Sequence, residues 1–126
     1  MVAVFAAGSL AGCSASVGAG LDKGGPVAYV EDVSGSGMDA LLDGTLEVRD
    51  TCIVVLREGH STLPVFEKPR TAWDGTTLSY EGRSFVDGAP IRLGGGEVDP
   101  SVADYLPAEC DYEAVFLVAS TVRDSD

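Results

Sequence analysis

The chain contains no Asn and no Gln, and in 126 residues it has two Lys, two Ile, one His and three Cys. Without Asn, no Asn-X-Ser/Thr glycosylation site exists. A single His and the lack of a Cys-x-x-Cys pair argue against zinc, which takes sets of Cys and His ligands. Eight Lys plus Arg stand against twenty Asp plus Glu, a net charge of −12. This charge opposes binding to nucleic-acid phosphates, so we predict no nucleic-acid partner.

Hydrophobic residues make up 45% of the chain, which is too many for a disordered acidic tail. The acid excess is uneven along the sequence. Residues 1–48 carry six acids and one base, residues 49–92 carry six of each, and residues 93–126 carry eight acids and one base. The middle of the chain is therefore electrically neutral and its flanks are acidic.

Residues 1–12, MVAVFAAGSLAG, are uncharged and precede Cys13. The run is too short to span a bilayer, which takes roughly 20 apolar residues, and is typical of a secretory signal ending in small residues. Leu10-Ala11-Gly12-Cys13 resembles the lipobox of bacterial lipoproteins. The resemblance implies a diacylglycerol on Cys13, cleavage before it, and a lipid anchor on the extracytoplasmic side of the cell membrane. No Lys or Arg precedes the run, so we expect a basic segment upstream. The alternative is a buried N-terminal segment.

Residues 13–43 are rich in Ser, Gly and Ala, and we predict a flexible tether between the lipidated Cys and the domain. Within it we expect a short extended piece at Val27–Val30 and one helical turn at Met38–Leu42. The pattern Asp32-x-Ser34-x-Ser36-Gly37, with Asp43 at the twelfth position, imitates an EF-hand calcium loop. Gly24-Gly25-Pro26 cannot form the entering helix, so we predict a solvated linker with no metal.

From 44 to 120 the sequence predicts a small β domain, followed by a disordered tail at 121–126. Leu46–Arg49 alternates apolar and charged residues, as a half-buried strand does, and the apolar run Cys52–Leu56 indicates a central strand. Further segments complete the expected pattern: strands at Thr62–Glu67, Thr76–Tyr80, Ile91–Leu93 and Tyr112–Ser120, a hairpin at Tyr80–Val86, a strand end with a bulge at Gly94–Gly96, and a short helix at Pro100–Leu106 capped by Asp99.

Five to seven short strands at spacings of about 8–12 residues favour an all-β fold, a small antiparallel barrel or sandwich. A single short helix before the last strand is compatible with an OB-like barrel. The segment Thr76–Val98, with its Y-x-G-R-x-F and L-G-G-G-E motifs, resembles the β-rich domains of uncharacterised secreted lipoproteins of high-GC Gram-positive bacteria. The resemblance covers about residues 44–119 and implies no specific activity.

Once Cys13 is assigned to lipid, Cys52 and Cys110 remain as an even pair in an exported domain. An oxidising compartment and a small core both favour a disulfide between them, and two buried thiols are the alternative. A bridge closing about 59 residues stabilises by roughly 4 kcal/mol through the entropy of the unfolded chain.

Catalytic signals are weak. His60, the single histidine, lies in a polar turn with Gly59 and Ser61, and no G-x-S-x-G motif accompanies it, so we expect an exposed turn residue rather than a catalytic one. The Gly-rich run lacks the Lys-Ser/Thr of a P-loop, and we predict no cofactor. The aromatic residues are candidates for contact with a sugar or peptide, with core packing as the ordinary alternative: Phe66, Trp73, Tyr80 and Phe85.

These features predict a membrane-anchored lipoprotein that acts as a non-enzymatic binding module at the cell envelope, with an envelope protein or glycan as partner. The alternatives are a small hydrolase acting on the cell wall and an accessory subunit of an envelope assembly. A deep pocket containing His60 or a close carboxylate pair would favour the hydrolase. A filled barrel with a flat, aromatic-edged surface would favour the binding module.

Overall fold

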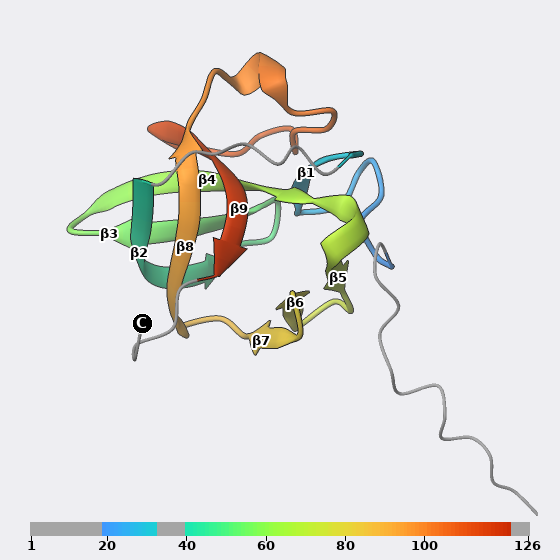
Figure 1. Ribbon diagram of the computed structural model, residues 1–126, viewed down its shortest axis with the longest axis horizontal. Helices are drawn as coiled ribbons and strands as arrows, with labels where there is room; N and C mark the ends of the chain where they lie inside the picture. Colours follow the sequence, from blue (N-terminus) through green and yellow to red (C-terminus); the bar gives the residue numbers. More distant parts are fainter. Residues whose placement is uncertain (1–18, 33–39, 122–126) are drawn as a thin grey trace, which may run out of the picture.

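The computed structural model describes residues 19–32 and 40–121 (Figure 1). In these ranges the chain is almost entirely strands and turns, and no helix there is long and apolar enough to cross a membrane. The elements are β1 (Ala28–Val30), β2 (Ala40–Val48), β3 (Ile53–Arg57), β4 (His60–Glu67), the 3-10 turn η2 (Lys68–Arg70), β5 (Thr71–Trp73), β6 (Leu78–Tyr80), β7 (Arg83–Phe85), β8 (Pro90–Glu97), the 3-10 turn η3 (Pro100–Val102) and β9 (Ala114–Thr121).

Five strands close into a barrel, which confirms the predicted all-β class. Their spatial order is β2-β3-β4-β9-β8 and back to β2, and the pair β4–β9 is parallel whereas the other barrel pairs are antiparallel. This is the connectivity of the OB fold, a five-stranded Greek-key barrel. The short β1 adds in parallel to the end of β4, and β5, β6 and β7 form a separate three-stranded sheet.

The hydrophobic pattern of each strand matches its place in the barrel. In β2 the buried side chains are Leu42 and Leu46, which point inward, while the alternating positions face solvent. In β3, β4 and β9 the apolar runs are continuous, because both faces are covered. The inner faces line the barrel core, and the outer faces of these three strands belong to a second, separate core.

The three-stranded sheet closes one end of the barrel (Figure 1). Leu78, Tyr80 and Phe85 join the barrel core, and the rings of Phe66 and Tyr80 lie 5.5 Å apart at 58°. A polar contact accompanies this packing. Arg70 Nη1 lies 3.3 Å from Oε1 of the buried Glu67.

Arg70 joins three parts of the molecule through the same nitrogen. Besides Glu67 at the end of β4, its Nη1 contacts Oε2 of Glu81 at 3.0 Å and donates to the carbonyl of Ala119 in β9 at 3.3 Å. The Tyr80 hydroxyl donates to Glu67 at 3.4 Å, and burial raises the pKa of Tyr80 far above its ordinary value. The small sheet is thus fixed to the barrel by apolar packing and by this charged cluster.

Two Glu-Gly turns join adjacent strands, one at the predicted polar turn around His60 and one in the hairpin predicted at Tyr80–Val86. Glu58-Gly59 joins β3 to β4 and Glu81-Gly82 joins β6 to β7, and all four residues have positive φ, as a type I′ turn requires. The run Gly94–Gly96 does not end a strand as predicted. It lies inside β8, where the predicted bulge is found: the register to β9 shifts between Gly94 and Gly95, and a Cβ on Gly95 would overlap the Leu117 carbonyl.

Pro64 lies in β4, which is not an edge strand, although a proline within a sheet is ordinarily confined to an edge strand or a bulge because it cannot donate to a ladder. β3 pairs with β4 at residues 60–62, and beyond this point the Ile53 N–H donates to the carbonyl of Pro26. The even-numbered residues of β4 point their N–H groups toward β3. The missing N–H of Pro64 therefore falls where the β3 ladder has already ended.

The predicted tether at 13–43 is wrong in part. Leu21 and Val27 are buried in the barrel core, Val27–Val30 is extended as predicted, and residues 40–42 begin β2 instead of a helical turn. Composition misled here because long-range contacts order the segment. The Tyr29 N–H and the Tyr105 carbonyl are hydrogen-bonded at 3.2 Å. The folded part thus begins before residue 44, and Cys13 lies outside the described residues.

The predicted helix at Pro100–Leu106 shortens to the 3-10 turn η3. Asp99 caps it as predicted, accepting a hydrogen bond from the Ser101 N–H at 2.9 Å. Ala103 is already extended, and Leu106 precedes Pro107, which disfavours helix at the position before it. The chain is instead drawn across the barrel surface.

Candidate functional site

The crossing loop, residues 98–113 between β8 and β9, covers the outer face of β3, β4 and β9 (Figure 1). The strands contribute buried side chains, among them Val54, Leu63 and Val115. The loop packs partly buried residues against them: Val98, Ala103, Leu106, Cys110 and Tyr112. This second core explains why these strands are apolar on both faces.

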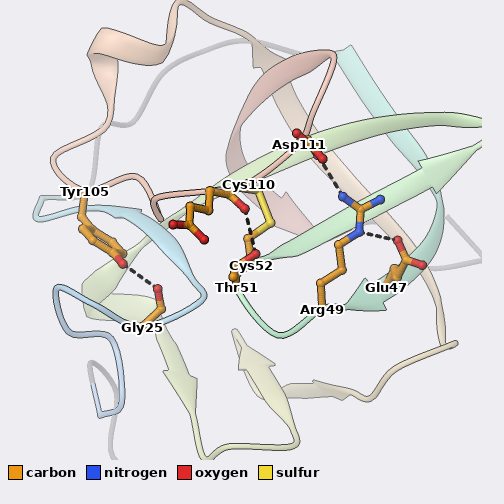
Figure 2. Close-up of a disulfide and its surroundings, with 9 residues drawn as sticks. Gly25, Glu47, Arg49, Thr51, Cys52, Tyr105, Cys110 and Asp111 are labelled. Atoms are coloured by element: carbon orange, nitrogen blue, oxygen red, sulfur yellow. Dashed lines mark hydrogen bonds and ion pairs between the residues drawn. A yellow bond between two sulfur atoms is a disulfide. The ribbon is translucent and has the colours of Figure 1, made fainter.

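A disulfide between Cys52 and Cys110 ties the crossing loop to the β2–β3 turn, which confirms the predicted pairing (Figure 2). The Cα atoms are 5.7 Å apart and Cys52 is fully buried. Two hydrogen bonds flank the bridge. Thr51 Oγ1 donates to the Glu109 carbonyl at 2.9 Å, and Arg49 Nη1 donates to the Asp111 carbonyl at 2.9 Å.

In OB barrels the second and third strands and the loops after the first and fourth strands form the ligand surface for oligonucleotides and oligosaccharides. The corresponding strands here are β3 and β4, and the corresponding loops are residues 49–52 and the crossing loop. The crossing loop itself lies on that surface and is bound to the other loop. Residues 97–113 also carry six carboxylates and no Lys or Arg. The usual ligand surface is therefore covered, and its cover is acidic.

A cavity of about 300 Å³ lies at the barrel end opposite the three-stranded sheet, and we call it the mouth cavity. Its wall is formed by the start of β2, the tip of the β3–β4 hairpin, the end of β8 and part of β9. Leu42 and Phe116 form a buried apolar floor, and Leu41 is 42% exposed beside it. The polar residues are Arg57, Glu58, His60, Thr62 and Glu97.

His60 stands at the rim of this cavity and is exposed, as predicted. Its Nδ1 lies 2.8 Å from Oε1 of Glu113, and both side chains are more than half exposed. The hydrogen bond and the charge of Glu113 raise the pKa of His60 above its ordinary value, and the same hydrogen bond lowers the pKa of Glu113. The pair joins the start of β4 to the end of the crossing loop. A catalytic general base is usually held in a desolvated cleft, whereas the His60–Glu113 pair is exposed to solvent.

Two cavities lie on the surface of the described residues. The barrel interior is filled by side chains, and the mouth cavity combines an apolar floor with charged groups of both signs. A second cavity of about 300 Å³, lined by Pro26, Asp50, Thr51, Tyr105 and others, has a mixed polar and apolar lining, part of which is already hydrogen-bonded: the Tyr105 hydroxyl donates to the Gly25 carbonyl at 2.6 Å (Figure 2).

The aromatic residues proposed for ligand contact are in the core. Phe66, Tyr80 and Phe85 are at most 7% exposed and Trp73 is partly buried against the same cluster. The four side chains do lie together, but they form the packing between the barrel and the small sheet and do not form an exposed surface on which a ligand could stack.

The residues of the calcium-like pattern are not brought together within the described part of the chain. Ser34, Ser36 and Gly37 of the calcium-like pattern lie outside the described residues, and Asp43 is on β2, 3.9 Å from Arg92 Nε. Among residues 19–32 and 40–121, no three His, Cys, Asp or Glu side chains gather to hold a metal ion.

Sequence reasoning missed the lining of the mouth cavity, namely Leu41, Arg57, Glu58, Glu97 and Phe116. One signal was available: the Glu-Gly turn predicts a tight hairpin, whose tip projects its charges at a barrel end. The position of β2 beside that tip depends on the register between strands, which the sequence of one strand does not predict. No known protein family, curated protein or solved structure matches the chain.

Proposed function

We propose that this protein is an exported lipoprotein, anchored through Cys13, whose OB-type domain acts as a non-enzymatic binding module at the cell envelope. The observation that carries the proposal is the buried Cys52–Cys110 bridge in a domain preceded by Leu10-Ala11-Gly12-Cys13. Disulfides of this kind persist in oxidising, extracytoplasmic compartments, which is where lipobox processing delivers a protein.

Two further observations support a binding role. Within the described residues the barrel core is filled by side chains, and the mouth cavity offers a preformed apolar floor beside charged groups. The acidic flanks of the sequence agree with such a position, because a chain of net charge −12 is repelled from an anionic membrane surface and held outward from it.

The hydrolase alternative rests on the His60–Glu113 pair beside the mouth cavity. The exposure of both side chains favours the binding module. A wall-degrading activity that disappears in His60→Ala would decide for the hydrolase. An accessory-subunit role would instead appear as a complex of fixed stoichiometry around the anchored form.

The test of the proposal is the mass of the protein extracted from membranes of a Gram-positive host. We expect a chain beginning at Cys13 and carrying a diacylglycerol, and we expect Cys13→Ala to yield protein that is not lipidated and is released from the membrane. An uncleaved chain with an unmodified Cys13 would contradict the proposal. The Cys52→Ala/Cys110→Ala variant is the control, because its lipid attachment should be unchanged.

A further inference from the structure

Within residues 19–32 and 40–121, no strand pairs with one edge of the first half of β2. The Leu46 N–H donates to the Ala89 carbonyl of the β8 side, and the Arg49 N–H donates to the Cys52 carbonyl of the β3 side. In an antiparallel ladder the bonding direction alternates, so even-numbered residues of β2 bond to β8 and odd-numbered residues bond to β3. The register is constant along both pairings, so this alternation holds from 40 to 48.

The two ladders of β2 end at different points. Pairing with β8 continues to Ala40, whereas pairing with β3 stops at Thr45, opposite Leu56. The N–H and C=O groups of Leu41 and Asp43 therefore point away from β8, toward the side where β3 has ended, and no strand in the described part of the chain pairs with them. A strand edge of this kind can accept an added strand.

The mouth cavity lies along this edge. Leu41 of β2 is part of its wall, and Leu42 and Phe116 form its floor. A strand added to β2 would alternate its side chains, so every second one would point toward the cavity and the others toward solvent. The volume of about 300 Å³ is suited to one or two apolar side chains and is at the lower limit for a whole small-molecule ligand.

The charge around the cavity indicates the character of such a strand. Glu58 at the hairpin tip and Glu97 at the end of β8 both line the cavity, and neither belongs to an ion pair within residues 19–32 and 40–121. Arg57 is a single opposing charge, and His60 is held by Glu113. With a net charge of −12 on the chain, a basic ligand is attracted and a second copy of the chain is repelled.

We infer that the mouth of the barrel binds an extended basic peptide segment of another protein, which adds as a strand to the edge of β2 at 40–44. Its apolar side chain enters the mouth cavity over Phe116, and its Lys or Arg side chains contact Glu58 and Glu97. This inference rests on the proposed function as a binding module and specifies its site and partner chemistry. It uses a different surface from the covered face of β3 and β4.

The test uses the full chain with Cys13→Ser and the disulfide intact, titrated with a short peptide of alternating lysine and valine blocked at both ends. We expect saturable, salt-sensitive binding that slows amide hydrogen exchange at Leu41 and Asp43 but not at Leu42. Glu58→Gln combined with Glu97→Gln should weaken binding by roughly tenfold or more. Glu109→Gln, an exposed glutamate far from the mouth, is the matched control and should bind normally.

Two comparison peptides separate strand addition from charge attraction. A glutamate-valine peptide should not bind, and a lysine-valine peptide N-methylated at alternate residues should lose roughly tenfold or more in affinity, because one edge no longer donates. The inference would be overturned if the methylated peptide bound as tightly as the unmethylated one, or if the Glu58→Gln/Glu97→Gln variant bound as tightly as the parent. Slow exchange at Leu41 and Asp43 before peptide is added would also overturn it, as would no binding at all. The result does not depend on lipid at Cys13, so it is separable from the outcome of the anchoring test.

Discussion

The two walls of the barrel differ in thickness. The wall of β3, β4 and β9 is covered on both sides, by the barrel core within and by the crossing loop without. Among the described residues, the wall of β2 and the first part of β8 is covered on its inner side alone, and no strand pairs with one edge of the first half of β2. The thick wall includes the surface that other OB barrels use for ligands, and here that surface serves stability. The thin wall contains this edge and borders the mouth cavity, which is the site that we propose for binding.

The largest effect should come from the bridge that holds the thick wall together. Replacing both cysteines, as Cys52→Ala/Cys110→Ala, should lower the free energy of unfolding by about 4 kcal/mol, since the segment between these two positions, 58 apart in the sequence, is no longer constrained in the unfolded chain. Urea unfolding of the oxidised protein and the variant measures it. Cys13→Ser is the matched control and should unfold like the parent. A loss below about 1 kcal/mol would mean that the crossing loop holds without its bridge.

Substitutions in the second core, beneath the crossing loop, should lower the free energy of unfolding as much as substitutions in the barrel core. Leu63→Ala removes a fully buried side chain beneath the crossing loop and Leu46→Ala removes one inside the barrel, so each should cost about 2–5 kcal/mol. Leu41→Ala on the thin wall should stay within about 0.5 kcal/mol. Thermal or urea unfolding of the three variants provides the comparison. If Leu63→Ala matched Leu41→Ala, the thick wall would not exist in solution.

The charged cluster at the closed end should have an intermediate effect. Arg70→Met leaves the buried Glu67 carboxylate without its guanidinium contact and releases the Ala119 carbonyl, at a cost of about 1–3 kcal/mol. The cost should fall when Glu67→Gln is already present, because the two residues are coupled. Arg57→Met, at the open end, is the control and should be near neutral. Equal costs of Arg70→Met in both backgrounds would show that the two side chains do not interact.

The smallest effect should be at the rim, where His60 and Glu113 are exposed. The raised pKa of His60 means that its contribution to stability is present below about pH 6.5 and is lost as pH rises through the folded value. The lowered pKa of Glu113 means that its contribution is present above about pH 4.3 and is lost as pH falls through its folded value. The pair therefore contributes most between these limits.

NMR titration of the His60 ring protons tests this directly, because the chain has no other histidine. Glu113→Gln should lower the pKa of His60 toward its ordinary value, and Glu58→Gln should lower it less, since Glu58 acts through charge alone. An unchanged pKa in Glu113→Gln would mean that the rim contact is not formed in solution.

Much of the thick wall was readable from the sequence. The apolar runs after Cys52 and Tyr112 predicted buried strands, and the cysteine count predicted the bridge. The crossing loop was not readable, because its apolar residues, such as Val98 and Leu106, follow neither strand nor helix spacing. The extended segment around Tyr29 was predicted, but its docking on the barrel was not, since that depends on residues more than seventy positions away. The candidate site was missed for a related reason: an unpaired edge is a property of the register between strands, and each strand alone carries no sign of it.

Native-state hydrogen exchange along β2 tests the difference between the walls most directly. The account predicts that the amides of Leu41 and Asp43 exchange on the order of a hundredfold faster than those of Leu42 and Gly44, whose N–H groups point to β8. Val54 and Leu63 of the thick wall should exchange slowest of all. Equal protection of Leu41, Leu42, Asp43 and Gly44 would contradict the account, because it would show that both edges of β2 are paired.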